Sequence, residues 1–173
     1  MTFKLLSKAA LALATMGLCL SAASAAYKSE YKLSVVPGAS SGWGQTATFF
    51  ADCVRQKSNG RINIKPYFGA QLMAGKQTSE LLLVRRGAID FALASTINWS
   101  PQIKELNITA LPFFVANNPD RYKAIDAIEA GKSGKMLEKA IEKTGVKFLG
   151  WSENGFRELT TSKGPIEKPE DMK

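Results

Sequence analysis

The feature that most constrains the fold is an alternation of strand-like and helix-like segments between residues 31 and 94. Residues 31–36, YKLSVV, are rich in β-branched and aromatic side chains and end at a Pro-Gly pair, which is typical of a strand. Residues 42–59 carry apolar side chains at helical spacing and end at an Asn-Gly pair, which predicts a helix. Residues 61–67, RINIKPY, alternate polar and apolar side chains, as in a second strand.

The pattern then repeats once. After a loop over residues 68–75, residues 76–86 predict a helix that stops at Gly87. Residues 88–94, AIDFALA, form a nearly continuous apolar run, which suits a strand covered on both faces. The resulting β-α-β-α-β order predicts a parallel sheet with right-handed crossovers and flanking helices.

Further elements are predicted in the second half of the chain. Residues 118–130 favour a helix with Asn118 as its cap and Pro119 at its first position. Residues 133–143 predict another helix, and residues 146–151 a further strand. The segment from Lys168 to Asp171 indicates the start of a short helix.

The first 25 residues have the layout of a secretory signal peptide. Lys4 and Lys8 precede an apolar run, residues 9–20, that is too short to span a bilayer, and Ala-Ser-Ala predicts cleavage after Ala25. Cys19 raises the alternative of a lipoprotein, but Leu18 stands where lipidation signals have a small residue. We therefore expect an exported protein that does not insert into the membrane once the signal is removed.

Charge and composition exclude several classes of function. The formal net charge is +8, but the cations are scattered, so attraction for small anions is favoured over nucleic-acid binding, with a merely solvated surface as the other possibility. The chain has no histidine, and Cys53 is the one cysteine left after signal cleavage. A disulfide, a zinc site and a Cys/His nucleophile are therefore not expected.

Arg157 is the strongest candidate for contact with a ligand. It lies in the segment 147–163, KFLGWSENGFRELTTSK, with glycine, phenylalanine and leucine close by. A guanidinium in a partly apolar setting needs an anion, and its planar donors match a carboxylate. A surface salt bridge to Glu153 or Glu158 is the alternative.

Polar and aromatic residues near predicted strand ends are further candidates. Trp43 lies between a strand and a helix, where a ligand wall is common, although packing explains it equally well. Ser95, Asn98 and Trp99 follow the predicted strand 88–94, where ligand contacts or simple loop capping are both possible.

Residues 27–173 resemble the DctP-type extracytoplasmic solute receptors of tripartite ATP-independent periplasmic (TRAP) transporters. The similarity is carried by YKLSVV, by FFADCVRQKSNGRINIKPYFGAQL, by ELLLVRRGAIDFALAST, by NWSPQIKELNITALPFF and above all by GWSENGFRELTTSKGPIEKPEDMK. The resemblance implies a type II-like, periplasmic-binding-protein-like α/β fold with two domains that close on a ligand. It implies that an arginine at the position of Arg157 contacts the ligand carboxylate.

The resemblance also implies further cleft positions and a domain arrangement. By alignment with the family, the other ligand-binding positions are Asn154, Asn98, Ser95, Gln77 and Val36. The expected organisation is a signal peptide over 1–25, α/β domain I over 26–150, and an interdomain strand with the start of a truncated second domain over 151–173. Truncation is expected because the family's receptors are longer and carry a second arginine beyond the last motif.

The implied function is capture of a small organic acid in the periplasm of a Gram-negative bacterium. The partners would be that acid and the membrane permease subunits, with no nucleic acid and no cofactor, and the protein would be a monomer without catalytic residues. Two alternatives remain, which are an exported α/β enzyme acting on small carboxylic acids and a receptor used for sensing.

Overall fold

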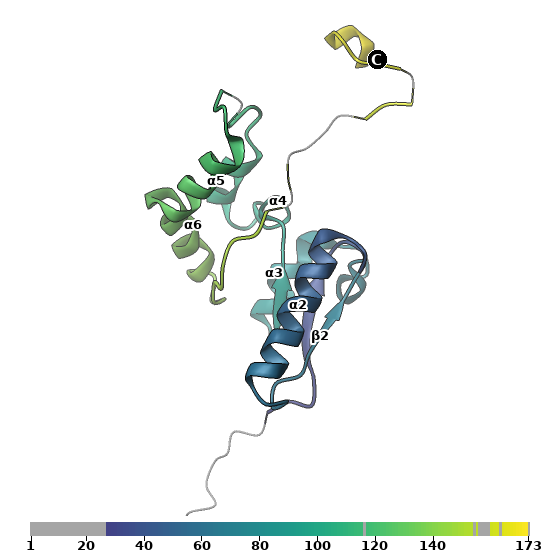
Figure 1. The fold of residues 1–173 in the computed structure, drawn as a ribbon, viewed down its shortest axis with the longest axis vertical. Helices are drawn as coiled ribbons and strands as arrows, with labels where there is room; N and C mark the ends of the chain where they lie inside the picture. The colour runs from purple at the N-terminus through teal and green to yellow at the C-terminus, as the bar shows by residue number, and fades with distance from the viewer. Residues whose placement is uncertain (1–26, 116, 154, 156–159, 163, 173) are drawn as a thin grey trace, which may run out of the picture.

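A three-stranded parallel sheet forms the first part of the fold. The computed structural model describes residues 27–115, 117–153, 155, 160–162 and 164–172. The strands are β1 (Tyr31–Val35), β2 (Ile64–Tyr67) and β3 (Phe91–Leu93), in the order β2-β1-β3 (Figure 1). Both strand pairs are parallel, so the predicted α/β class with crossover helices is confirmed.

Helix α2 (Gly42–Lys57) covers one face of this sheet. In the register of β1 and β3, Leu33 lies opposite Phe91 and Val35 opposite Leu93. Alternate strand residues share a face, so all four side chains point to the same side. They pack there with the apolar side of α2, which begins and ends close to its predicted limits.

Helix α3 (Glu80–Arg85) lies on the opposite face. It follows two single-turn 3-10 helices, η1 (Gln71–Met73) and η2 (Gln77–Ser79). The helix stops where the sequence predicts, because Gly87 adopts a φ of +70° and its N–H donates to the carbonyl of Val84. Helices on both faces leave the carboxyl ends of the strands as an accessible edge.

Several helices follow β3. They include α4 (Thr96–Trp99) and the 3-10 helix η3 (Lys104–Ala110). The sequence did not predict either helix, because so short a helix with several polar side chains shows no apolar repeat. Helices α5 (Arg121–Ala130) and α6 (Lys132–Glu142) then pack on each other to one side of the sheet (Figure 1). A short 3-10 helix, η4 (Pro169–Met172), stands away from the rest of the fold.

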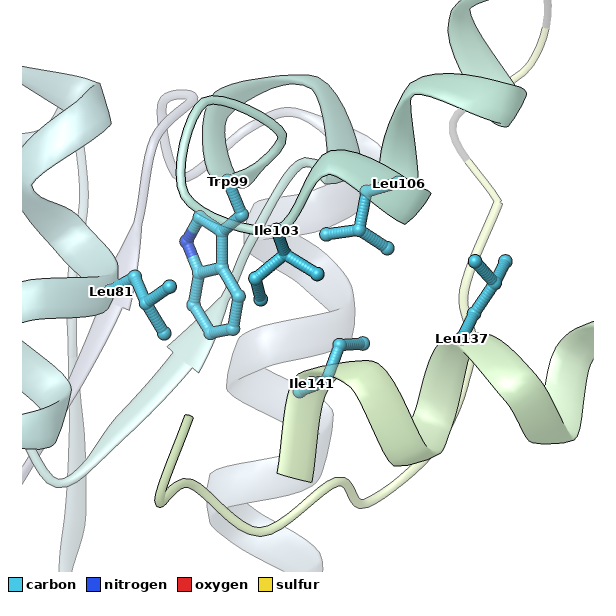
Figure 2. Close-up of a cluster of buried hydrophobic side chains, with 6 residues drawn as sticks. All are labelled: Leu81, Trp99, Ile103, Leu106, Leu137 and Ile141. Carbon is cyan, nitrogen blue, oxygen red and sulfur yellow. The ribbon is translucent and has the colours of Figure 1, made fainter. Parts of the chain in front are cut away.

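A second apolar cluster joins α6 to the sheet domain. Its buried members come from α3, α4, the η3 region and α6, and they are Leu81, Trp99, Ile103, Leu106, Leu137 and Ile141. Figure 2 shows the Trp99 indole between the side chain of Leu81 from α3 and that of Ile103, which follows α4. The cluster fixes α4 and the following loop against α3, since tightly packed interiors tolerate little displacement.

The prediction of a strand over residues 146–151 is wrong. The segment has no regular secondary structure and no strand partner among the described residues. Val146, Phe148 and Trp151 instead pack by their side chains against the cluster that contains Trp99. The apolar run signalled burial correctly, but a strand also requires a neighbouring backbone for its hydrogen bonds.

The predicted cap of the helix over residues 118–130 is also wrong. Asp120, and not Asn118, caps α5, because its Oδ1 accepts a hydrogen bond of 3.0 Å from the backbone N–H of Lys123. The Asn118 side chain accepts a hydrogen bond from the N–H of Asp120 and forms a turn before the helix.

No helix in the described ranges is long and apolar enough to cross a membrane.

Candidate functional site

The carboxyl ends of β1 and β3 form the edge at which predicted site residues gather. Val35 lies opposite Leu93 in the register, so the chain leaves both strands side by side, into Val36 on one and toward Ser95 on the other. The strand order β2-β1-β3 makes the edge between β1 and β3 a topological switch point, which is where open α/β sheets usually bind their ligands. Val36 and Ser95 are both half-buried there.

Helix α2 begins at the same edge. Ser41 caps it, since its Oγ accepts a hydrogen bond of 3.0 Å from the N–H of Gly44 and donates one of 2.6 Å to the carbonyl of Gly38. The turn brings Trp43 into partial burial beside the apolar cluster under α2. Trp43 lies in the first turn of α2, close to the positive end of the helix dipole, and its role as a ligand wall stays a prediction.

The side-chain amides of Asn98 and Gln77 form a pair after the end of β3. The Asn98 Nδ2 group donates a hydrogen bond of 2.9 Å to Oε1 of Gln77. Nearby, the hydroxyls of Thr96 and Thr109 are 2.8 Å apart, a contact that sequence reasoning missed because the two threonines are separated by thirteen positions. These uncharged groups can donate to and accept from hydroxyl or carbonyl oxygens of a ligand.

A large hollow of about 1840 Å³ opens between the α2 face of the sheet and the α5–α6 pair. Trp43 and Ser95 line it, whereas Val36, Gln77 and Asn98 do not. Its volume exceeds the roughly 300–1,000 Å³ of small-ligand pockets, and exposed apolar side chains such as Phe113 and Leu149 form much of its wall. A small acid could therefore occupy no more than one corner of the hollow.

The structure thus brings the predicted residues together in part. Gln77 touches Asn98, and Trp43 and Ser95 share one hollow. Arg157 and Asn154 lie outside the described residues. The candidate residues that the structure describes, which are Val36, Trp43, Gln77, Ser95 and Asn98, all have uncharged side chains.

Acidic side chains lie close together around Glu129 on α5. Burial is the main cause that raises the pKa of Glu129, and the nearby carboxylates of Glu153 and Asp126 raise it further. Glu129 and Glu153 both line the hollow. Arg121, Lys139, Lys143 and Lys147 line the same hollow, so its charged side chains alone do not locate an anionic ligand.

Glu80 is a polar residue of this region that sequence reasoning missed. Its carboxylate is completely buried and accepts hydrogen bonds from Ser34 Oγ at 2.6 Å and from Trp99 Nε1 at 3.0 Å. Burial raises the pKa of Glu80, while the two hydrogen bonds act in the opposite direction. The available signal was an acid at the start of the run ELLLV, on a helix between two buried strands.

Metal binding has no support in the described ranges. No group of three or more histidine, cysteine, aspartate or glutamate residues gathers there in a way that could hold an ion. Cys53 is partly buried on α2 as a free thiol.

A parallel sheet of order 2-1-3 with helices on both faces defines a domain of the α/β class. Residues 33–173 match the family of bacterial extracellular solute-binding proteins, family 7, also called DctP. The chain belongs to this family, as its sequence motifs predicted.

Curated and solved relatives agree with the family assignment. A TRAP periplasmic solute-binding protein of Ralstonia eutropha H16, solved with bound (S)-2-acetolactate, is 54% identical, with a TM-score of 0.79 over 85% of this chain and 46% of that chain. The 2,3-diketo-L-gulonate-binding periplasmic protein YiaO of Escherichia coli is 28% identical over 72% of this chain and 36% of its own length. The C4-dicarboxylate-binding protein DctB of Bacillus subtilis is 29% identical over 83% and 39%. The chain therefore spans less than half the length of these relatives.

Proposed function

We propose that the whole gene product captures a short-chain hydroxy or oxo carboxylate in the periplasm and delivers it to the membrane subunits of a TRAP transporter. The observation that carries this proposal is the neutral polar edge at the ends of β1 and β3 in a chain 54% identical to an acetolactate-binding relative. Hydroxyl and amide groups there suit a ligand that carries hydroxyl or carbonyl oxygens besides its carboxylate.

Within this proposal, the residues have separate roles. Arg157, with Asn154 beside it, would hold the carboxylate, because a guanidinium fork donates two parallel hydrogen bonds to it. Ser95, Asn98 and Gln77 would bind the remaining oxygens, and Val36 and Trp43 would form the apolar wall. The single negative charge of such an acid would leave no need for a cation among the edge residues.

Transport would need no covalent chemistry. The ligand would shift an equilibrium between open and closed forms by its greater affinity for the closed one. Exclusion of water on closure would strengthen the hydrogen bonds to its carboxylate. The membrane subunits would then recognise the closed form.

The direct test is calorimetric titration of the purified whole gene product with 2-acetolactate. Binding with recovery of unchanged 2-acetolactate supports capture, whereas conversion of the acid to a product would identify the exported enzyme instead. Arg157→Ala should weaken binding by about 2–5 kcal/mol, as when one member of a buried charge pair is removed. Arg86→Ala, an exposed arginine at the end of α3, is the matched control and should bind as the wild type does. Equal affinity of all three proteins would contradict the role of Arg157.

A further inference from the structure

We propose that Glu80 is a positioning residue for the candidate site, which holds α4 in place through the indole of Trp99. The proposal rests on the carboxylate-binding function proposed above. The Glu80 carboxylate accepts hydrogen bonds from Ser34 and Trp99, whereas Asn98 bonds to Gln77, so the effect of Glu80 on the ligand would be transmitted by α4.

The contacts of Glu80 connect three elements. Its two carboxylate oxygens are used separately, one by Ser34 Oγ from β1 at 2.6 Å and the other by Trp99 Nε1 from α4 at 3.0 Å. Both bonds are buried, and the Glu80 residue has no exposed surface. The carboxylate therefore sets the direction in which the Trp99 ring points, because an indole has a single N–H donor.

An acid at this place is costly for the fold. The ion pairs found among the described residues do not include Glu80. A carboxylate taken out of water without a cation costs more free energy than an apolar side chain of the same size in a packed core. A requirement for directed hydrogen bonds explains the presence of an acid here better than core stability does.

The element that Glu80 orients carries the candidate ligand contacts. Trp99 follows Asn98, whose amide donates to Gln77, and Gln102 Nε2 donates to the carbonyl of Thr78 at 2.7 Å. Three hydrogen bonds thus join residues 77–80 to residues 98–102. The Gln77 and Gln102 bonds are exposed to competing water, whereas the Glu80 bond is not.

Helix α4 depends on such contacts because it has only four residues. A helix of one turn has almost no stability of its own, so tertiary interactions decide its orientation. Figure 2 shows the Trp99 ring between the side chains of Leu81 and Ile103. Apolar packing has little directionality, and the hydrogen bond to Glu80 supplies the angle that keeps Asn98 and Ser95 at the strand-end edge.

The test compares three variants of the whole gene product by calorimetric titration with 2-acetolactate. Glu80→Met keeps the length of the side chain but removes both acceptors, and Trp99→Phe removes the donor while it keeps an aromatic ring. Each should weaken binding about tenfold, as expected when one buried hydrogen bond is lost. Glu80→Gln can still accept from the indole and should bind within about twofold of the wild type.

Ile141→Ala is the control for a purely structural effect. Ile141 belongs to the same apolar cluster but lies on α6 and makes no side-chain hydrogen bond to α4. It should lower the midpoint of urea unfolding at least as much as Glu80→Met does, yet keep the affinity for 2-acetolactate. Wild-type affinity in Glu80→Met, or an equal loss of affinity in Ile141→Ala, would overturn the proposal.

A measurement without ligand separates this proposal from the proposed function. If the wild type does not bind 2-acetolactate, the assignment of the ligand fails, but α4 can still be examined by NMR. Glu80→Met should shift the Trp99 indole N–H signal and speed hydrogen exchange at the backbone N–H of Trp99 and Ser100, which donate to Ser95 and Thr96. Exchange unchanged from the wild type in Glu80→Met would overturn the positioning role.

Discussion

At the scale of single residues, Asp90 shows how one side chain ties the start of the sheet together. One of its carboxylate oxygens pairs with the Lys28 ammonium, and the other accepts a hydrogen bond of 2.9 Å from the backbone N–H of Lys32. Burial is the largest influence on the pKa of Asp90 and acts to raise it. The bonds from Lys28 and Lys32 together outweigh burial, and the pKa is lowered.

This lowered pKa predicts a loss of stability in acid. A carboxyl group whose pKa is lower in the folded state stabilises the fold above its unfolded pKa of about 4 and ceases to do so as the pH falls through the folded pKa. In Asp90→Asn, the free energy of unfolding should therefore fall less between about pH 5 and pH 2.5 than in the wild type.

Urea unfolding at a series of pH values would measure this difference. Asp52→Asn is the control, because Asp52 makes an exposed ion pair to Arg55 on the same helix and contributes little. Parallel pH curves for the wild type and Asp90→Asn would show that the contacts of Asp90 do not stabilise the fold.

At the scale of elements, helix α2 is shaped by two glycines with different surroundings. A Cβ atom on Gly44 would lie 2.6 Å from the carbonyl oxygen of Gly38 and closer still to the carbonyl oxygen of Ala39. A Cβ atom on Gly42 would meet nothing within 4 Å. The chain leaving β1 therefore passes close to the start of α2 at one position and leaves open space at the other.

Alanine at these two positions should have opposite effects. Gly44→Ala should destabilise the protein by about 1–3 kcal/mol, since the turn beside the candidate site must move. Gly42→Ala should stabilise it by about 0.5–1 kcal/mol, because alanine favours the helix more than glycine does. Urea unfolding would measure both, and a Gly44→Ala protein as stable as Gly42→Ala would contradict the close approach.

At the scale of the whole molecule, the large hollow beside the sheet is bordered by exposed apolar side chains. Phe113 is 87% exposed, Leu149 69% and Met136 61%, and all three line it. Apolar side chains gathered around one concavity differ from scattered ones, because together they offer a surface that other apolar molecules can cover.

Residues 27–173 produced alone should therefore bind a fluorescent apolar dye such as anilinonaphthalene sulfonate. Phe113→Ser should reduce the dye fluorescence, since it removes a ring from the wall of the hollow. Phe49→Ser is the matched control, because Phe49 is 75% exposed but does not line the hollow. Equal fluorescence from these two variants would mean that the dye does not bind there.

Much of the fold follows from local patterns along the chain. Neighbouring residues predict the order β-α-β-α-β, the extent of α2 and the end of α3 at Gly87. They can do so because side-chain spacing and backbone freedom are local properties. The carboxyl-edge location of Val36 and Ser95 follows in turn from the parallel order of the strands. Family membership was also readable, because the motifs are continuous stretches.

Features that depend on distant partners were not readable in this way. Residues 146–151 have the composition of a strand, but only a neighbouring backbone makes one, and the described chain provides side-chain packing instead. The contact between Thr96 and Thr109 and the burial of Glu80 between Ser34 and Trp99 arise from elements brought together in space. The sequence therefore specified the class of the fold and the edge at which Val36 and Ser95 lie. Packing in three dimensions selected the hydrogen bonds between distant elements, because such bonds require partners that no local pattern identifies.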